Sequence, residues 1–451
     1  MYMINNSLVA ARIIWLMVAS IYLQQVCVIN IGGSFKLYEL LALVLLIVSI
    51  PSLLKFEKIR IPHFSFVFLL VFFIFSPLLP LVIRFVVNPE TEYYIKYPEA
   101  DNVLRFNIVF SAVFTYVYYV LCWVVVKNIS TNDIVVGSTK RYIRLYVYVG
   151  CFVALYAIYS SFFVNLIGFP DLIPSVIDFR NSKPSEQFRP SGFSAEPGIY
   201  IYMLGWMLIF LITNAVGISY KLRLALSVLT FFVIILTSSS QIVSVFFVFF
   251  LYVVLYSSKK VKVAALLIIF LVLSILSTYF VDSGLSNQIN YVLFEKLANF
   301  FSSPTHTLDS GAFRSYTARI GFAIFTDYPW GIGAGLSYFY MSNYEHMMGI
   351  LSWGERLTFS SAPQNAHSMI LAELGAFGYL FLFLFFVSVF IAAFRFDRKY
   401  RDPLARSLVL GLPMVYLMLM SIYPISSIYI WLPIALCLTF FRRRHAISSG
   451  R

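Results

Sequence analysis

Apolar stretches about as long as a lipid bilayer is thick recur along almost the whole chain. A helix of about 20 apolar residues spans the hydrocarbon core, and the sequence contains twelve such windows. They lie near 8–30, 36–54, 64–87, 107–127, 143–167, 199–219, 222–237, 240–256, 262–280, 367–394, 404–421 and 422–441. Hydrophobic residues make up 60% of the chain and charged residues only 12%, which excludes a soluble multidomain protein. We therefore predict an all-α polytopic membrane protein of about twelve spans, folded as a single integral domain over residues 1–451.

The net charge of +13 is unevenly distributed between the loops. Alternate polar segments carry 21 of the 33 basic residues and only four acidic ones. These segments are 55–60, 127–144, 221–223, 259–262, 395–406 and 442–451. By the positive-inside rule they face the cytoplasm, so both termini are predicted to be cytoplasmic. Because this charge orients the chain in a membrane, it gives no reason to expect nucleic acid as a partner.

The three remaining long loops, 88–106, 168–198 and 281–366, then face outward. The longest polar stretch, from Asp282 to Gln364, is too aromatic for a disordered linker. Helical spacing of its apolar residues predicts an amphipathic interfacial helix over 287–301.

A second helix is predicted in this loop from Phe313 to Phe325. It should stop at Asp327-Tyr328-Pro329, because proline disfavours the α conformation in the residue before it. The helix carries Arg314 and Arg319, whose side chains diverge by roughly 140° on a straight helix. Both reach one ligand only if Arg314 lies at the helix start. The alternative is one arginine in the site and one facing solvent.

Three glycines, Gly331, Gly333 and Gly335, follow this helix. They break regular structure and let backbone amides approach a ligand closely. A dinucleotide-binding turn is excluded, because no strand precedes them in a βαβ unit.

The loop 168–198 is rich in proline and arginine. Arg180 and Arg189 are candidate phosphate ligands, because a guanidinium donates two parallel hydrogen bonds to phosphate oxygens and stays protonated. The alternative is an ordinary solvated loop whose charges pair locally. Sequence alone leaves both open.

His367 lies at the outer end of an apolar window, after Gln364-Asn365-Ala366. Its imidazole can accept a proton from a sugar hydroxyl near neutral pH, although a histidine here can also be a simple interfacial hydrogen-bonding residue. Glu373 lies deeper in the same window, where an ionisable residue is a candidate for function or for a structural network. No metal or cofactor is predicted, since the histidines lack paired metal spacing.

Taken together, these motifs resemble those of the O-antigen polymerases of the Wzy type and the related O-antigen ligases. The resemblance rests on an arginine-rich outer loop that runs into Gly192 and Glu196-Pro197-Gly198. Fifteen residues separate Arg189 from Gly205, and fifteen separate Arg319 from Gly335. Family members often have His-Asn at the last motif, whereas this chain has His367-Ser368.

The resemblance implies a membrane-embedded, inverting and metal-independent glycosyltransferase with a GT-C-like fold and no cofactor. The implied substrate is an undecaprenyl diphosphate-linked oligosaccharide at the periplasmic side of a bacterial inner membrane. Membrane lipids and a chain-length regulator are the other implied partners. The loops 168–198 and 281–366 would together form the site.

On this basis the chain is predicted to polymerise lipid-linked repeat units of O-antigen or a similar surface polysaccharide. Arg180, Arg189, Arg314 and Arg319 would bind the donor diphosphate. His367 would deprotonate the acceptor hydroxyl, with Glu196 as the second choice for the base.

Two alternatives stay open. An O-antigen ligase would use the same donor and transfer the glycan to lipid A core. A lipid-linked oligosaccharide flippase or exporter would bind its substrate near the bilayer midplane, where the ionisable residues are few: Arg12, Glu39, Arg84 and Glu373.

Overall fold

The computed structural model describes residues 6–24, 27–30, 34–54, 63–87, 101–164, 193, 197–237, 239, 241–257, 310–347, 363–422 and 424–442. The regular secondary structure of these residues is helical apart from one short antiparallel pair of strands, β1 (Cys27–Asn30) and β2 (Ser34–Lys36). A helical membrane protein is what the sequence predicts, because backbone polar groups within lipid must be satisfied inside each segment.

The helices follow the predicted windows. In chain order they are α1 (Asn6–Ser20), α2 (Leu37–Leu54), α3 (Ser65–Leu70), the π-helix η1 (Val71–Phe75), α4 (Leu79–Val87), α5 (Asp101–Thr131), α6 (Asp133–Ile158), the π-helix η3 (Tyr159–Val164), α7 (Pro197–Ile212), α8 (Tyr220–Leu236), α9 (Ile242–Tyr256), α15 (Ala366–Tyr400), α16 (Pro403–Met418) and α17 (Ile428–Leu438). The predicted outer loop adds α13 (Ser310–Asp327) and α14 (Ser337–Met347).

Three described helices are long and apolar enough to cross a membrane: Val109–Thr131, Asp133–Ile158 and Ala366–Tyr400. Shorter helices lie in the other described windows, and the window 262–280 lies outside the described residues. The total of twelve spans and the GT-C-like fold therefore stay predictions.

The first window is shorter than predicted. A span was expected to reach residue 30, but α1 ends at Ser20 and the chain continues into strand β1. Gln24 and Gln25 interrupt the apolar run, and the β-branched Val28 and Ile29 favour extended backbone.

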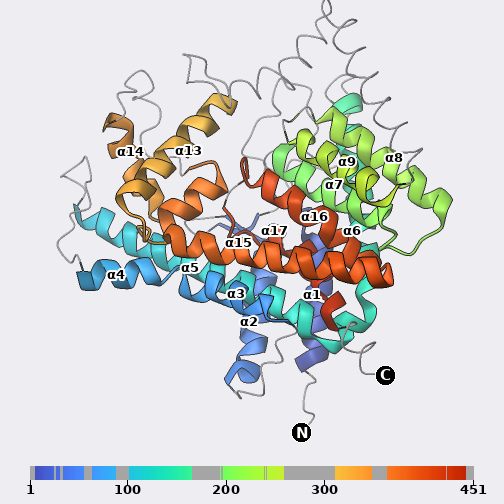
Figure 1. Ribbon diagram of the computed structural model, residues 1–451, viewed down its shortest axis with the longest axis horizontal. Helices are drawn as coiled ribbons and strands as arrows, with labels where there is room; N and C mark the ends of the chain where they lie inside the picture. Colours follow the sequence, from blue (N-terminus) through green and yellow to red (C-terminus); the bar gives the residue numbers. More distant parts are fainter. Residues whose placement is uncertain are drawn as a thin grey trace, which may run out of the picture.

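The long helix α15 runs across the middle of the view in Figure 1, with α13 and α14 over its beginning and α7, α8 and α9 on the opposite side of the molecule. Helix α15 packs against α16, α3 and η1, and α5 packs against α17. The buried ring of Trp431 lies edge-on to Phe73, with centroids 4.7 Å apart. At Gly411 a side chain would overlap the ring of Trp206, so this glycine lets α16 approach α7 closely, as small residues do in membrane bundles.

The start of α1 and the end of α17 lie at the same end of the bundle. Both contact the turn between α5 and α6: Asn132 Nδ2 donates to the Ser7 carbonyl oxygen over 2.8 Å, and Arg442 pairs with Asp133. The rings of Phe396 on α15 and Phe440 lie 5.4 Å apart, which brings the end of α15 to this same end.

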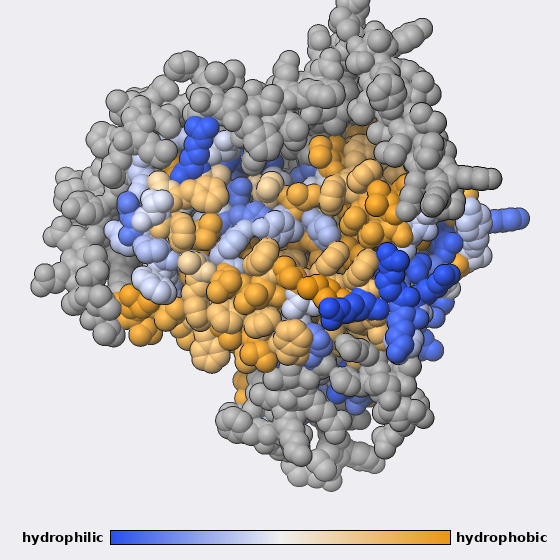
Figure 2. Space-filling model, viewed as in Figure 1, coloured by the Kyte–Doolittle hydropathy of each residue, from blue (hydrophilic) through white to orange (hydrophobic). Residues whose placement is uncertain are grey.

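Several described basic residues of the predicted cytoplasmic segments lie at or near this end. Arg398, Lys399 and Arg401 lie at the end of α15, and Arg144 donates to the carbonyls of Val216 and Gly217. Figure 2 shows hydrophobic residues across the middle of the visible face and a hydrophilic cluster where α15 ends. The helices α13 and α14 lie at the other end of α15.

Candidate functional site

The site is built around an interruption in α15. Asn365 caps the helix, because its side-chain oxygen accepts from the amides of His367 (2.9 Å) and Ser368 (3.2 Å). At Gly375 the backbone leaves the helical conformation, with φ 67° and ψ −169°. Residues 366–374 therefore form a separate first piece of α15, called the start segment below.

A turn formed by residues 328–336, called the glycine turn below, fills this interruption. The Ile332 amide donates to the Ala372 carbonyl and the Gly333 amide to the Glu373 carbonyl, both over 2.9 Å, and the Ala376 amide donates to Pro329 over 2.9 Å. Backbone groups released by the break are thus satisfied by the turn, as a buried helix interruption requires.

Glycine is required on both sides of this contact. Gly331 has φ 88° and Gly375 has φ 67°, a region that residues with a side chain rarely adopt. A Cβ on Gly331 would lie 2.5 Å from the Glu373 carbonyl oxygen and 2.6 Å from the Gly375 nitrogen. The two backbones therefore touch with no room for a side chain.

Gly333 and Gly335 also have positive φ, 112° and 75°. The sequence suggested that the amides of this turn approach a ligand, but here they bind the protein itself. The Gly333 amide is taken by α15, and the Gly335 amide by the Glu373 carboxylate. The glycines serve helix docking in this structure.

The Glu373 side chain is 1% exposed and accepts hydrogen bonds at the start of α14. Its Oε2 accepts from the Gly335 amide over 2.9 Å. Its Oε1 accepts from the Ser337 hydroxyl over 2.6 Å and from the Ser337 amide over 3.4 Å. Glu373 therefore caps α14 from another helix.

Helix α14 is tied in turn to α13. The Tyr344 hydroxyl donates to the carboxylate of Asp327, the last residue of α13. Burial, followed by this bond to a carboxylate, raises the pKa of Tyr344 well above its ordinary value, so the phenol stays protonated. The rings of Tyr328 and Tyr340 lie edge-on with centroids 5.6 Å apart.

Helix α13 lies directly on the start segment of α15. The Gln364 amide donates to Thr317 Oγ1 over 3.1 Å, and a Cβ on Gly321 would lie 2.9 Å from the Ser368 Cβ. The predicted second loop helix is confirmed, with its end at Asp327 and its start three residues earlier than expected. Helix α13 with its arginines and the start segment with His367 are separate motifs in the sequence, and the fold brings them together here.

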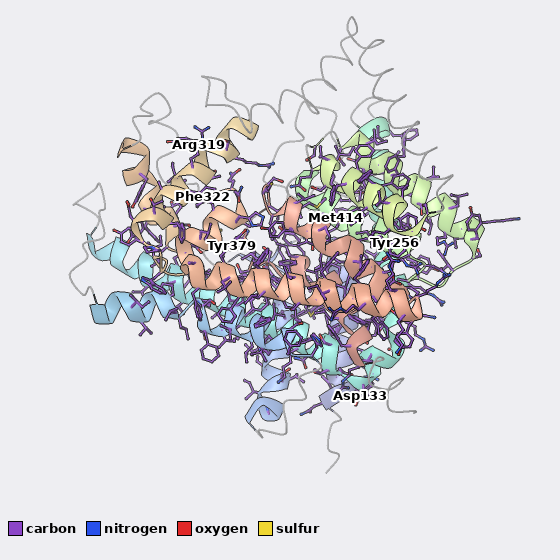
Figure 3. All side chains as sticks on the ribbon, viewed as in Figure 1. Asp133, Tyr256, Arg319, Phe322, Tyr379 and Met414 are labelled. Atoms are coloured by element: carbon purple, nitrogen blue, oxygen red, sulfur yellow. The ribbon has the colours of Figure 1, made fainter. Side chains whose placement is uncertain are left out.

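The two arginines leave α13 in different directions. The helix begins at Ser310, so Arg314 lies a full turn inside it and not at its start, and the condition for a shared ligand is not met. Arg314 lies on the stripe with Thr317 and Gly321 that faces α15, whereas Arg319 is about 140° away from it. Both side chains are half-buried. Figure 3 shows Arg319 toward the top of the view, with Tyr379 below it.

His367 is buried, 7% exposed, and joins α15 to α16. Its Nε2 lies 2.9 Å from the backbone carbonyl oxygen of Tyr416, one of the last carbonyls of α16, which lack a partner within the helix. Its Nδ1 lies 3.3 Å from the Tyr379 hydroxyl, which is 2.8 Å from the Tyr416 hydroxyl. The imidazole is thus held in a defined orientation.

Residues 224–387 match the model of a family described as O-antigen ligase. The match covers 164 of the 451 residues and is a likeness to the O-antigen polymerase and ligase superfamily. A search of curated proteins gave no match. The matched region contains α13, the glycine turn, α14 and the start segment of α15, but not Tyr416 of α16, which holds the His367 ring.

Superfamily members are glycosyltransferase-like membrane enzymes that act on lipid-linked glycans. The matched region thus resembles that of membrane enzymes of polysaccharide biosynthesis. The motifs that suggested the superfamily in the sequence lie partly in the described residues. Arg180, Arg189, Glu196 and the predicted helix 287–301 lie outside them.

Sequence reasoning missed Tyr379, Tyr416 and Ser337, which position the candidate residues. The two tyrosines lie in apolar windows, among 31 tyrosines in the chain, and no local pattern distinguishes them. Ser337 carried a weak signal, because a serine is a common residue at a helix start. Among the described residues no three His, Cys, Asp or Glu side chains are grouped as a metal site would need.

Proposed function

We propose that this protein is an inverting, metal-independent membrane glycosyltransferase that polymerises lipid-linked repeat units of O-antigen or a similar surface polysaccharide. The donor would be a glycan on undecaprenyl diphosphate at the periplasmic face of the bacterial inner membrane. The observation that carries the proposal is the docking of the arginine-bearing α13 on the start segment of α15, where Thr317 and Gly321 contact Gln364 and Ser368 next to His367.

An inverting displacement requires two functions on opposite sides of the reacting sugar. A proton acceptor is needed where the acceptor hydroxyl attacks, and cationic donors are needed where the diphosphate leaves. The start segment and α13 offer one residue type each: His367 on the first and Arg319 on the second. Arg319 lies off the packed stripe of α13, where it can meet a donor that arrives at the outer face.

Arginine suits the leaving group because its planar fork binds phosphate oxygens in pairs and keeps its charge. In the proposed reaction the glycosidic oxygen of the donor stays with the diphosphate, whose developing negative charge Arg319 stabilises. Arg180 and Arg189 from the loop 168–198 would complete this diphosphate site, whereas Arg314 faces the start segment of α15 and would not share it.

His367 would take the proton of the acceptor hydroxyl as that oxygen bonds to the anomeric carbon. Nε2 donates to the Tyr416 carbonyl, so the proton would go to Nδ1, the nitrogen next to the Tyr379 hydroxyl. Glu196 stays the second choice for this role.

A specific observation favours one second candidate, because the matching family model is described as O-antigen ligase. In a ligase the same donor site would serve, and the acceptor would be lipid A core instead of a new repeat unit. The two functions share the proposed roles of Arg319 and His367 and differ only in the acceptor.

Arg319→Ala in a strain that lacks its own copy tests the proposal, with surface glycans separated by size on a gel. Loss of a polymerase leaves single repeat units attached to the cell surface, whereas loss of a ligase leaves none. The matched control is Arg223→Ala, since Arg223 lies on α8, outside the proposed site, and its guanidinium stacks on the Tyr220 ring. A normal ladder of glycan lengths from Arg319→Ala, with protein present in the membrane, would contradict both candidates.

A further inference from the structure

Glu373 is a buried carboxylate whose described hydrogen-bond partners are all uncharged. It accepts from the Gly335 amide, the Ser337 amide and the Ser337 hydroxyl. Burying a carboxylate without a cation is unfavourable even when its oxygens are hydrogen-bonded, and an ionisable residue in a membrane helix usually marks a functional constraint. A short neutral side chain at the start of α14 itself would cap that helix at less cost to stability. Glu373 therefore needs an explanation beyond helix capping.

Its length and position supply one. Glu373 lies two residues before the break at Gly375, and its own carbonyl accepts from Gly333. Backbone and side chain of this one residue thus hold both the middle of the glycine turn and the start of α14. A shorter side chain on α15 would not reach Gly335 and Ser337 together.

A continuous series of contacts links Glu373 to α13. Ser337 starts α14, and Tyr344 on α14 binds Asp327, the last residue of α13. On its other side the turn is held by α5, because the Ser111 hydroxyl donates to the Gly335 carbonyl over 2.8 Å. The C-terminal end of α13 is thus fixed to the membrane helices through the residues that Glu373 binds.

We infer that Glu373 is a positioning residue. By holding the glycine turn and α14 on α15, it fixes the position of α13 and its arginines relative to the start segment and His367. The inference rests on the proposed glycosyl transfer and assigns Glu373 no contact with the substrate. A displacement of about 1 Å between donor and acceptor groups lowers the rate of a transfer reaction by about 100-fold. Loosening the contacts of Glu373 with the glycine turn and α14 therefore slows transfer, although the substrate sites themselves stay intact.

The test compares Glu373→Ala and Glu373→Gln in the full-length protein. Alanine removes every side-chain bond to the turn and α14. Glutamine keeps an oxygen for the Gly335 amide, and its NH₂ group can donate to the Ser337 hydroxyl, which then acts as acceptor. A positioning residue should therefore tolerate glutamine much better than alanine, whereas a residue needed for its charge or proton should not.

Two quantities are measured on detergent-purified protein. One is hydrogen exchange of the backbone amides in residues 331–341. The other is the rate of glycan transfer, with undecaprenyl diphosphate-linked repeat units extracted from a strain that lacks this chain as the probe. Glu373→Ala should raise amide exchange about tenfold or more and lower the maximal rate about 100-fold at unchanged KM. Glu373→Gln should lose less than about tenfold in rate.

Glu39→Gln is the matched control, because Glu39 is also buried, with 8% of its surface exposed. It accepts hydrogen bonds from the Lys36 amide and the Tyr118 hydroxyl, which are not part of the glycine turn or α14. Glu39→Gln should leave both quantities within about twofold of the parent. Ser337→Ala removes only the 2.6 Å hydroxyl donor and keeps the test decisive if Glu373→Ala does not fold. It should raise exchange in 331–341 and lower the rate less than Glu373→Ala would.

The inference is overturned if glutamine and alanine slow transfer equally without a change in exchange, since the carboxylate would then act by its charge. It is also overturned if exchange rises and transfer does not slow. Failure of the proposed function looks different: Arg319→Ala would then leave transfer normal, whatever the exchange of residues 331–341 shows.

Discussion

The Nε2 atom of His367 donates a hydrogen bond of 2.9 Å to the backbone carbonyl oxygen of Tyr416. A carbonyl oxygen only accepts, so Nε2 carries the hydrogen and the lone pair of the neutral ring is on Nδ1. The ring is therefore fixed between α15 and α16, and any proton it takes up goes to the nitrogen that faces the Tyr379 hydroxyl.

This geometry makes His367→Gln an informative substitution. The glutamine amide nitrogen can take the place of Nε2 and still donate to the Tyr416 carbonyl, whereas nothing replaces the lone pair of Nδ1. We expect a thermal midpoint close to that of the parent protein and a loss of about 100-fold or more in transfer rate, the usual contribution of a general base. Thermal unfolding in detergent and the glycan ladder measure the two effects.

His367→Ala is the companion variant, because it removes both the base and the bond to α16. It should lose as much activity as His367→Gln and also unfold at lower temperature. Undiminished polymer from His367→Gln would assign the histidine to structure alone and transfer the role of base to another residue.

A second prediction concerns the two tyrosines beside the imidazole. Tyr379→Phe removes the hydroxyl that lies 3.3 Å from Nδ1, whereas Tyr416→Phe keeps the backbone carbonyl that holds Nε2. We expect a loss of up to about tenfold in rate for Tyr379→Phe, the size of one hydrogen bond, and a smaller loss for Tyr416→Phe. Equal losses in the two variants would indicate that the hydroxyl pair acts only in packing.

Local patterns sufficed to predict parts of this region. Proline chemistry predicted the end of α13 at Asp327, and the three glycines of the turn all have positive φ. The pairing of the glycine turn with the interruption at Gly375 could not be predicted, because Gly331 and Gly375 lie 44 residues apart and each looks like an ordinary chain breaker. The same holds for Tyr416, which meets His367 only through packing of α15 against α16.

The end of α1 shows the opposite failure. Hydropathy extended the first window to residue 30, since Val28 and Ile29 are as apolar as helix residues in lipid. Their β-branching favours extended backbone instead, and the structure has strand β1 there. Average hydropathy does not separate an apolar strand from the last turns of a helix.

A third prediction follows from the contact between the two glycines. Gly375→Ala places a methyl group against the backbone of Trp330 and 2.6 Å from the Gly331 nitrogen, at a φ and ψ that only glycine adopts readily. The expected cost is about 1–3 kcal/mol in the free energy of unfolding, seen as a lower thermal midpoint in detergent. Gly137→Ala is the control, because no atom outside its own turn of helix lies within 4 Å of a Cβ there, and it should be neutral or slightly stabilising.

The last prediction separates the two arginines of α13. Arg319 lies off the stripe that packs on α15, so Arg319→Ala should lower the transfer rate by about 100-fold or more, as loss of a group that stabilises transition-state charge does. Arg319→Lys should fall between the parent and alanine variants, because lysine keeps the charge and loses the bidentate fork.

Arg314 shares its stripe with Thr317 and Gly321, which contact the start segment of α15. Arg314→Ala should therefore lower the thermal midpoint more, and the transfer rate less, than Arg319→Ala. The reverse order would assign the donor diphosphate to the α15 side of the helix and would contradict the role proposed for Arg319.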